Sequence, residues 1–141
     1  GVHSGNIFVD SNRRIRLMAG MTGTRGYAQI GHGGYNAAPS GGGAVGETTG
    51  DIFVRSRTEM VDLRWGGTGT ATSTGTYIQI GHGGYVSDGN DVRSNLRGKV
   101  EVQAGTNLLL RSVTGGTTVG NYVQVGHGGI NWAGDHGGDI D

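Results

Sequence analysis

Three histidines at regular intervals are the residues of this sequence best suited to chemistry. Each lies in a copy of the pattern Y-x-Q-(I/V)-G-H-G-G, and His32, His82 and His127 follow one another at intervals of 50 and 45 residues. Imidazole is a common metal ligand, so stacked histidines could hold a row of metal ions. No Cys, Asp or Glu recurs beside them, however, and a closed zinc site needs four ligands. We therefore expect a structural role, in which the ring nitrogens bond backbone groups and each other, with no metal and no cofactor.

Glutamine and tyrosine also recur at fixed positions before each histidine. Stacked amides can hydrogen-bond along a fibre axis, as in cross-β structures, and stacked tyrosines can form a similar row. An alternative interpretation is an aromatic and polar strip that binds glycans. We favour structural ladders for these positions, which are Gln29, Gln79, Gln124, Tyr27, Tyr77 and Tyr122.

Short apolar segments with a period of two must position these residues, and this period is typical of β-strands. The first kind of segment follows a repeated glycine, the second lies further on, and the histidine pattern is the third. The first two kinds occupy residues 5–10, 50–55 and 98–103, and residues 15–17, 61–63 and 108–110. The sequence therefore predicts a single array over residues 1–141, with repeats at 5–49, 50–97 and 98–137 and the start of a fourth at 138–141.

The repeats predict an all-β fold, a parallel β-helix with three strands per coil and about one coil per repeat of 40–50 residues. Like strands would stack ~4.8 Å apart into three parallel sheets. Solvent-facing connections would include residues 36–49, 86–97 and 131–137. The alternative is a sandwich or barrel of antiparallel hairpins. Equivalent apolar residues would fill the core in five columns: Ile7/Ile52/Val100/Ile140, Val9/Val54/Val102, Ile15/Val61/Leu108, Leu17/Leu63/Leu110 and Ile30/Ile80/Val125.

Other candidate sites do not repeat with the array. Alternate threonines from Thr68 to Thr76 could present an ice-binding face, and residues 87–91 suggest a calcium loop, but each feature occurs in one repeat only. A carbohydrate-active enzyme needs paired carboxylates or a basic residue in a groove. The acidic residues fall at different phases of the repeat and make no obvious pair: Asp10, Glu59, Asp62, Glu101 and Asp135. We expect no enzymatic activity.

Composition excludes several classes of partner and site. Eleven basic and eleven acidic residues cancel, which gives no electrostatic footprint for nucleic acid or an anionic membrane. No apolar run approaches the ~18–20 residues that a membrane helix needs. The chain has no cysteine, which excludes disulfides and thiolate metal sites and leaves the redox compartment open.

The succession G-(D/N)-I-x-V, an apolar strand and Y-x-Q-I-G-H-G-G resembles repeats of very large bacterial surface and secreted proteins, the filamentous-haemagglutinin-like, adhesin-type β-solenoids. The resemblance covers essentially the whole chain, and G-H-G-G is its most specific part. It implies a right-handed parallel β-helix, an extracellular or cell-surface location, and a structural or adhesive role without catalysis. The uneven repeat lengths and Val125 in place of isoleucine depart from the regular pattern.

The two ends of the sequence share one phase of the repeat, since residues 3–7 match residues 136–140. An uncapped solenoid exposes unpaired strand edges, so we expect further repeats in the same chain or copies stacked end to end. The expected function is a structural rod or filament on or outside a bacterial cell. The alternatives are an adhesin or glycan-binding module, for which surface glycans would be the partner, and a carbohydrate-active β-helix enzyme.

Overall fold

The structure is a computed structural model, and it describes residues 2–20, 26–34, 46–66, 75–86, 92–112, 120–130, 132–133 and 136–141. These residues form strands in successive layers and no helix, so this part of the chain has no helix able to cross a membrane. The first layer contains β1 (Val2–Ser4), β2 (Ile7–Ser11), β3 (Ile15–Ala19) and β4 (Tyr27–Ile30). The second contains β5 (Gly46–Thr49), β6 (Ile52–Ser56), β7 (Val61–Trp65) and β8 (Tyr77–Ile80). The third contains β9 (Val92–Arg97), β10 (Val100–Ala104), β11 (Leu108–Arg111) and β12 (Tyr122–Val125), and a fourth begins with β13 (Trp132–Ala133) and β14 (His136–Gly137).

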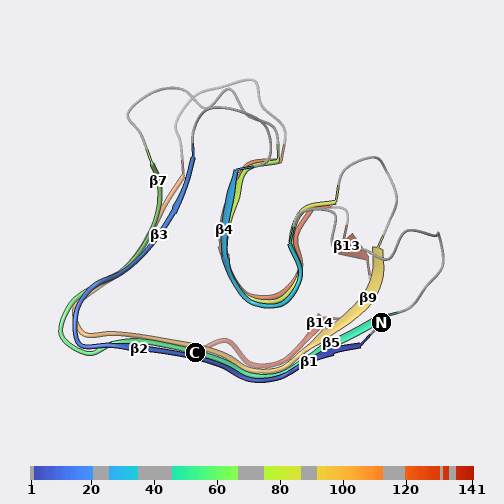
Figure 1. Cartoon of the computed structure of the whole chain (residues 1–141), viewed down its shortest axis with the longest axis horizontal. Coiled ribbons are helices and arrows are strands. Elements are labelled where there is room, and N and C mark those ends of the chain that lie inside the picture. The colour runs from blue at the N-terminus through green and yellow to red at the C-terminus, as the bar shows by residue number, and fades with distance from the viewer. Residues whose placement is uncertain are drawn as a thin grey trace.

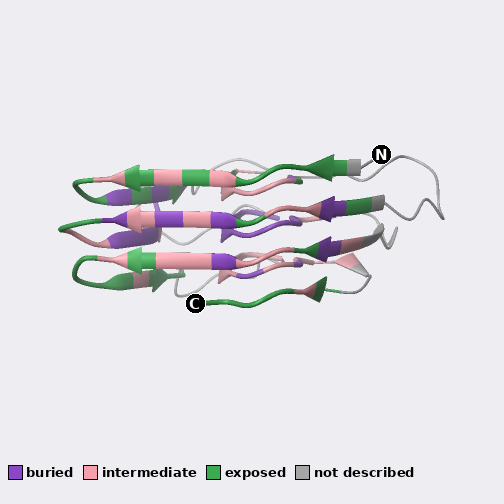
Figure 2. Ribbon diagram, turned by 90° about the horizontal axis from the view of Figure 1, so that it is seen from below, coloured by how far each residue is buried: buried purple, intermediate pink, exposed green. Residues whose placement is uncertain are grey.

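Equivalent strands of successive layers pair in parallel and form four sheets. Three of them are β2-β6-β10, β3-β7-β11 and β4-β8-β12, and the fourth runs β1-β5-β9 with both β13 and β14 paired to β9. Viewed down the stack, the layers trace nearly the same path and lie over one another (Figure 1). Figure 2 shows them from the side, with the two ends of the chain at opposite ends of the stack. The fold is therefore all-β, with parallel strands stacked along one axis.

Each full layer has four strands rather than the three expected from the sequence. The additional strands β5 and β9 lie within the connections predicted at residues 36–49 and 86–97, so that part of the prediction is wrong. GETT has no apolar side chain and VRSNLR has only two, so neither shows the alternation of apolar residues on which the prediction relied. They form strands because each finds a parallel partner in the neighbouring layer, and Thr48 and Leu96 are buried there.

The strand registers confirm the alignment of all five predicted columns, although Leu108, Leu110 and Ile140 at the end of the stack are exposed and lie outside the core. Ile52 pairs with Ile7 in the layer before it and with Val100 in the layer after it, and Ile140 bridges to Val100. Val9, Val54 and Val102 pair in the same sheet, and the remaining three columns pair in the same manner along the other two sheets. All pairings between described strands are parallel, so the alternative of antiparallel hairpins is wrong.

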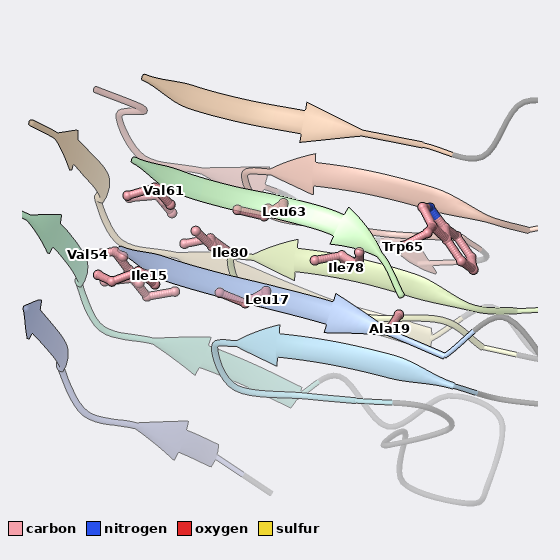
Figure 3. Close-up of a cluster of buried hydrophobic side chains, with 11 residues drawn as sticks. Ile15, Leu17, Ala19, Val54, Val61, Leu63, Trp65, Ile78 and Ile80 are labelled. Atoms are coloured by element: carbon pink, nitrogen blue, oxygen red, sulfur yellow. The ribbon is translucent and has the colours of Figure 1, made fainter. Parts of the chain in front are cut away.

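One apolar cluster fills the space between three of the sheets (Figure 3). Side chains of β3 and β7 face those of β8 and β6 across it. Its members include Ile15, Leu17, Val54, Val61, Leu63, Ile78 and Ile80.

The middle layer is much more deeply buried than the layers on either side (Figure 2). Leu63 is fully buried, whereas Leu110, in the same column of the third layer, is 45% exposed. Tyr77 is likewise fully buried, whereas Tyr27 in the first layer is 47% exposed. Leu63 and Tyr77 have a neighbouring layer on both sides, whereas Leu110 and Tyr27 have one on a single side. The two ends are not equally exposed, since Leu17 in the first layer remains buried.

We expect Leu63→Ala to lower the free energy of unfolding by about 2–5 kcal/mol, because it opens a cavity between two layers. Leu110→Ala is the matched control, since the same side chain is already half exposed at that position, and it should cost much less. Chemical denaturation followed by circular dichroism measures both, at protein concentrations low enough to prevent association. Equal losses would contradict the observed order of the layers.

Candidate functional site

The histidine pattern forms a short strand followed by a U-turn of the chain. Strands β4, β8 and β12 carry its tyrosine and glutamine, and the chain reverses directly after them (Figure 1). In the second layer the glycines on either side of His82, Gly81 and Gly83, have φ of 150° and 116°. Residues with a Cβ rarely adopt such values, so the turn depends on glycine.

The histidine rings stack in one column along the axis. The ring centroids of His32 and His82 are 5.0 Å apart and those of His82 and His127 are 4.9 Å apart, with nearly parallel planes. Within its own layer, each Nε2 lies 2.8–3.0 Å from the carbonyl oxygen of the glycine that precedes β2, β6 or β10. The histidine therefore ties the U-turn to the opposite wall of the same layer. The three acceptors are Gly5, Gly50 and Gly98.

A second hydrogen bond joins each histidine to the next layer. The backbone N–H of His32 donates to Nδ1 of His82, and the N–H of His82 donates to Nδ1 of His127, both over 3.1 Å. Nδ1 must therefore lack a hydrogen, and Nε2 must carry the one that it donates to the glycine carbonyl. The expectation that the ring nitrogens also bond each other is wrong. Both nitrogens of His82 are occupied by backbone groups, which leaves neither for a metal ion.

Burial keeps the His82 ring neutral. The side chain is fully buried, and the loss of hydration lowers the pKa of His82 to about 4. The carbonyl of Gly50 acts in the opposite direction, as does the charge of Asp51, while the stacked rings of His127 and His32 add to the lowering of this pKa. Protonation would also turn Nδ1 from an acceptor into a donor that faces the N–H of His32.

The glutamines connect successive layers through glycine carbonyls and not through one another. The Gln79 amide nitrogen donates to the carbonyl oxygens of Gly126 and Gly128 in the next layer, at 3.0 and 2.9 Å. Gln29 makes the equivalent pair of bonds to the second layer. The glutamines do stack in register, but the expected amide-to-amide bonds are wrong. Because Gln79 is fully buried, its bonds satisfy carbonyls that would be costly to leave unpaired.

The tyrosines stack beside the glutamines. The centroids of Tyr27 and Tyr77 are 5.0 Å apart, those of Tyr77 and Tyr122 are 5.1 Å apart, and the planes are within 8° of parallel. The Tyr77 hydroxyl donates to Oε1 of Gln29 in the preceding layer over 3.2 Å. Burial and the neighbouring tyrosines raise the pKa of Tyr77 and of Tyr122, which keeps these hydroxyls protonated. In the middle layer this column is buried, so it offers no surface to a glycan there.

Glycine recurs in the turn because adjacent layers approach too closely for a side chain. A Cβ at Gly83 would lie 2.3 Å from the carbonyl oxygen of Gly128, and one at Gly50 would lie 2.1 Å from that of Gly5. Gly5 has a similar φ of 144°, yet a Cβ there would meet nothing within 4 Å. Its position in the first layer explains the difference, since the clash at Gly50 comes from the layer before it.

Sequence reasoning missed two clusters of ion pairs on the sheets. Asp10 accepts hydrogen bonds of 2.7–3.2 Å from Arg57 and Arg55 in the next layer, and these bonds hold the pKa of Asp10 well below its usual range. Exposed ion pairs of this kind contribute little to stability, because water and salt screen them. The Asp10–Arg55 pair could have been predicted from the sequence, because the two residues hold the same position in successive repeats.

The second cluster surrounds Asp62, which is fully buried between Arg16 and Arg64. Burial opposes the charge of this carboxylate, but the Arg64 and Arg16 guanidinium groups outweigh it and lower the pKa of Asp62. Both acidic side chains thus have arginine partners in the stack.

Some predicted features lie outside the described residues, namely Asp135, the loop at 87–91 and the threonines of the run before Thr76. Within the part of the chain that the structure describes, no three His, Cys, Asp or Glu side chains are grouped so as to hold a metal ion.

Comparisons with known proteins assign no family to this chain. The chain matches no protein-family model, no curated protein and no solved structure. Its function must therefore be argued from the geometry of the layers.

We expect stability to fall between pH 7.5 and pH 5. The pKa of His82 is about 4 in the folded chain and ~6.5 in an unfolded one, so the unfolded state binds more protons as the pH falls. The contribution of the neutral ring is complete above pH ~6.5 and is lost as the pH falls towards 4. Thermal melting at a series of pH values measures the effect.

Two variants identify the group responsible. His82→Gln should reduce the pH dependence over this range, whereas His3→Gln, at an exposed histidine outside the column, should leave it unchanged. Asp10 and Asp62 have lowered pKa values and stay ionised down to pH 5, so they do not contribute there. A pH dependence that survives in His82→Gln would assign the effect to another group.

Alanine substitution separates backbone strain from steric clash in one glycine column. Gly5→Ala should cost about 1–2 kcal/mol, because it introduces only the strain of a positive φ. Gly50→Ala has nearly the same φ and adds the contact with the Gly5 carbonyl, so it should disrupt the interface between the first two layers. Denaturation curves for the two variants test this, and similar losses would show that the layers do not approach as closely as described.

Proposed function

We propose that this chain is a structural module, a right-handed β-solenoid in which each layer is one coil, and that it forms part of a stiff extracellular rod or filament on or outside a bacterial cell. The observation that carries the proposal is the repetition of one set of contacts at both interfaces between full layers. The histidine, glutamine and tyrosine bonds between the first and second layers all recur between the second and third. Such a stack grows by adding copies of the same unit.

The polar groups of the histidine and glutamine columns form the hydrogen bonds that hold the layers together. Both ring nitrogens of His82 bond backbone groups, and the Gln79 amide is bonded to the next layer. Asp10 and Asp62 are paired with arginines. We therefore assign no catalytic step to these residues, and no observation favours the carbohydrate-active enzyme.

The resemblance of the repeats to adhesin-type bacterial β-solenoids supports the right-handed coil and the extracellular or cell-surface location. That resemblance rests on the G-H-G-G turn, which the structure shows to be the point where layers contact through glycine.

An adhesive or glycan-binding surface is the second candidate, and one observation favours it. Phe8 is 74% exposed on the outside of β2, and its ring lies 5.5 Å from that of Phe53 in the next layer. The Arg55 guanidinium lies over the Phe53 ring at 5.5 Å. Saturable binding of an oligosaccharide that is lost in Phe8→Ala would favour this candidate over a purely structural role.

A tandem fusion tests the rod directly. Asp141 holds the position that Phe8 holds in the first layer, so residues 1–141 joined directly to a second copy starting at Val9 continue the repeat without a break. We expect the fusion to keep the same cross-section and to lengthen along the stack by three layers, roughly 14 Å at ~4.8 Å per layer. Small-angle X-ray scattering measures both quantities.

The control fusion carries one extra glycine at the junction. A one-residue shift exchanges the two faces of every following strand, so this fusion should scatter as two bodies joined by a hinge. If the two fusions scatter alike, the layers do not stack as a continuous rod and the proposed function fails.

A further inference from the structure

The two end faces of the stack carry complementary hydrogen-bonding groups. We call the outer edge of β2, β3 and β4 the first face, and the outer edge of β10, β11 and β12 the last face. On the first face, within the described residues, nothing donates to Nδ1 of His32 or to the carbonyl oxygens of Gly31 and Gly33. On the last face, again among described residues, the N–H of His127 has no acceptor, and the Gln124 amide bonds only the His127 carbonyl of its own layer.

Each of these groups has a counterpart bonded inside the stack. The N–H of His82 bonds Nδ1 of the next histidine, and the Gln79 amide bonds the two glycine carbonyls of the next turn. The last face therefore offers the donors that the second layer offers to the third. The first face offers the acceptors that the third layer offers to the second.

We propose that the last face of one copy pairs head to tail with the first face of a second copy of this chain, in the register that continues the tyrosine, glutamine and histidine columns. The inference rests on the proposed rod and adds its partner, polarity and register. In that register the N–H of His127 donates to Nδ1 of the second copy's His32, and Gln124 donates to the carbonyls of its Gly31 and Gly33.

The apolar and charged side chains agree with this register. Leu108 and Leu110 on the last face are 41% and 45% exposed, although their equivalents Val61 and Leu63 are fully buried between layers. No described position places like charges directly opposite each other. The facing strand pairs with a charged member are Arg97 with Ser4, Glu101 with Phe8, Gln103 with Asp10, Leu109 with Arg16, and Arg111 with Met18.

Residues 136–141 already occupy part of the last face. His136 pairs with Leu96, and Ile140 bridges to Val100, which are the positions that His3 and Ile7 of a second copy would take. The incoming strands offer the same backbone bonds, so displacing residues 136–141 costs few of them. Ile140 is 57% exposed, which makes this segment weakly held by burial. The incoming layer also covers β11 and β12, whose outer edges pair with no strand among the described residues. The side chains of His136 and Ile140 lie beside Gly128 and Gly126 in the turn after β12, so they must move away when the second copy docks.

The pairing has a direction, because the two faces differ. Two first faces would bring the His32 acceptors together, and two last faces would bring the His127 donors together. Neither arrangement forms the column bonds. Association between unlike faces does not close on itself when it continues a straight stack, so it gives linear chains of copies.

Two variants, each blocking one face, test this polarity. Tyr27→Lys places a charge on the first face, and Leu108→Lys places one on the last face; both side chains are already partly exposed. We expect each variant alone to associate at least roughly tenfold more weakly than the unmodified chain, because a desolvated unpaired charge opposes docking. Mixed in equal amounts, they should form a discrete dimer through the last face of Tyr27→Lys and the first face of Leu108→Lys. Sedimentation velocity at neutral pH measures the association of each variant, of their mixture and of the unmodified chain. Circular dichroism checks that all of them are folded.

Phe8→Lys is the matched control, because it adds the same charge on the outside of β2 but opposite Glu101 of the other copy, and it should associate at least as tightly as the unmodified chain. Dimerisation of either blocked variant by itself would overturn the head-to-tail polarity. A mixture of folded variants that remains monomeric would overturn the pairing.

The unmodified chain gives a further test that needs no variant, since a folded chain that stays monomeric at high concentration contradicts the proposal. If the in-register tandem is extended while these samples stay monomeric, the rod stands and the pairing between copies fails.

Discussion

The hydrogen bond from the backbone of one histidine to the ring of the next is the interaction on which the rest of this structure depends. It joins neighbouring layers through a ring that also bonds the opposite wall of its own layer. The U-turn and the wall therefore keep the same relative position in every layer. The spacing between histidines can consequently change from 50 to 45 residues without shifting any strand register. The glycines beside the ring follow from the same constraint, since only they allow the turns to approach each other closely enough.

The sequence was most informative where the stack requires similar residues at equivalent positions. Columns such as Leu17, Leu63 and Leu110 could be predicted because parallel stacking places identical phases of the repeat against each other. The strands β5 and β9 could not be predicted in this way, because the residues of GETT and VRSNLR that pair with one another differ in type. They become strands through pairing with neighbouring layers, and pairing partners are visible only once the path of each layer is known.

Chemical detail was harder to predict than position. The repeats place Gln29 in register with Gln79, which suggests amide-to-amide bonding, but the Gln29 amide nitrogen donates to glycine carbonyls of the next turn instead. The tautomer of His82 depends on a donor 50 residues away in the sequence. The burial of a side chain cannot be predicted from its position in the repeat. Tyr77 and Tyr27 hold equivalent positions, yet Tyr77 is buried between layers and Tyr27 is exposed at an end of the stack.

The histidine column and the apolar columns contribute in different ways. A column of leucine and valine gains from burial on either side, so it would stack equally well in both directions. The histidine column has a donor on one side and an acceptor on the other, and that order is the same in each layer. Apolar burial therefore attracts layers without setting a direction, while the histidine bonds, together with those of glutamine and tyrosine, give the stack its direction. A protonated ring would lose the acceptor at Nδ1, and with it the bond that gives this column its direction.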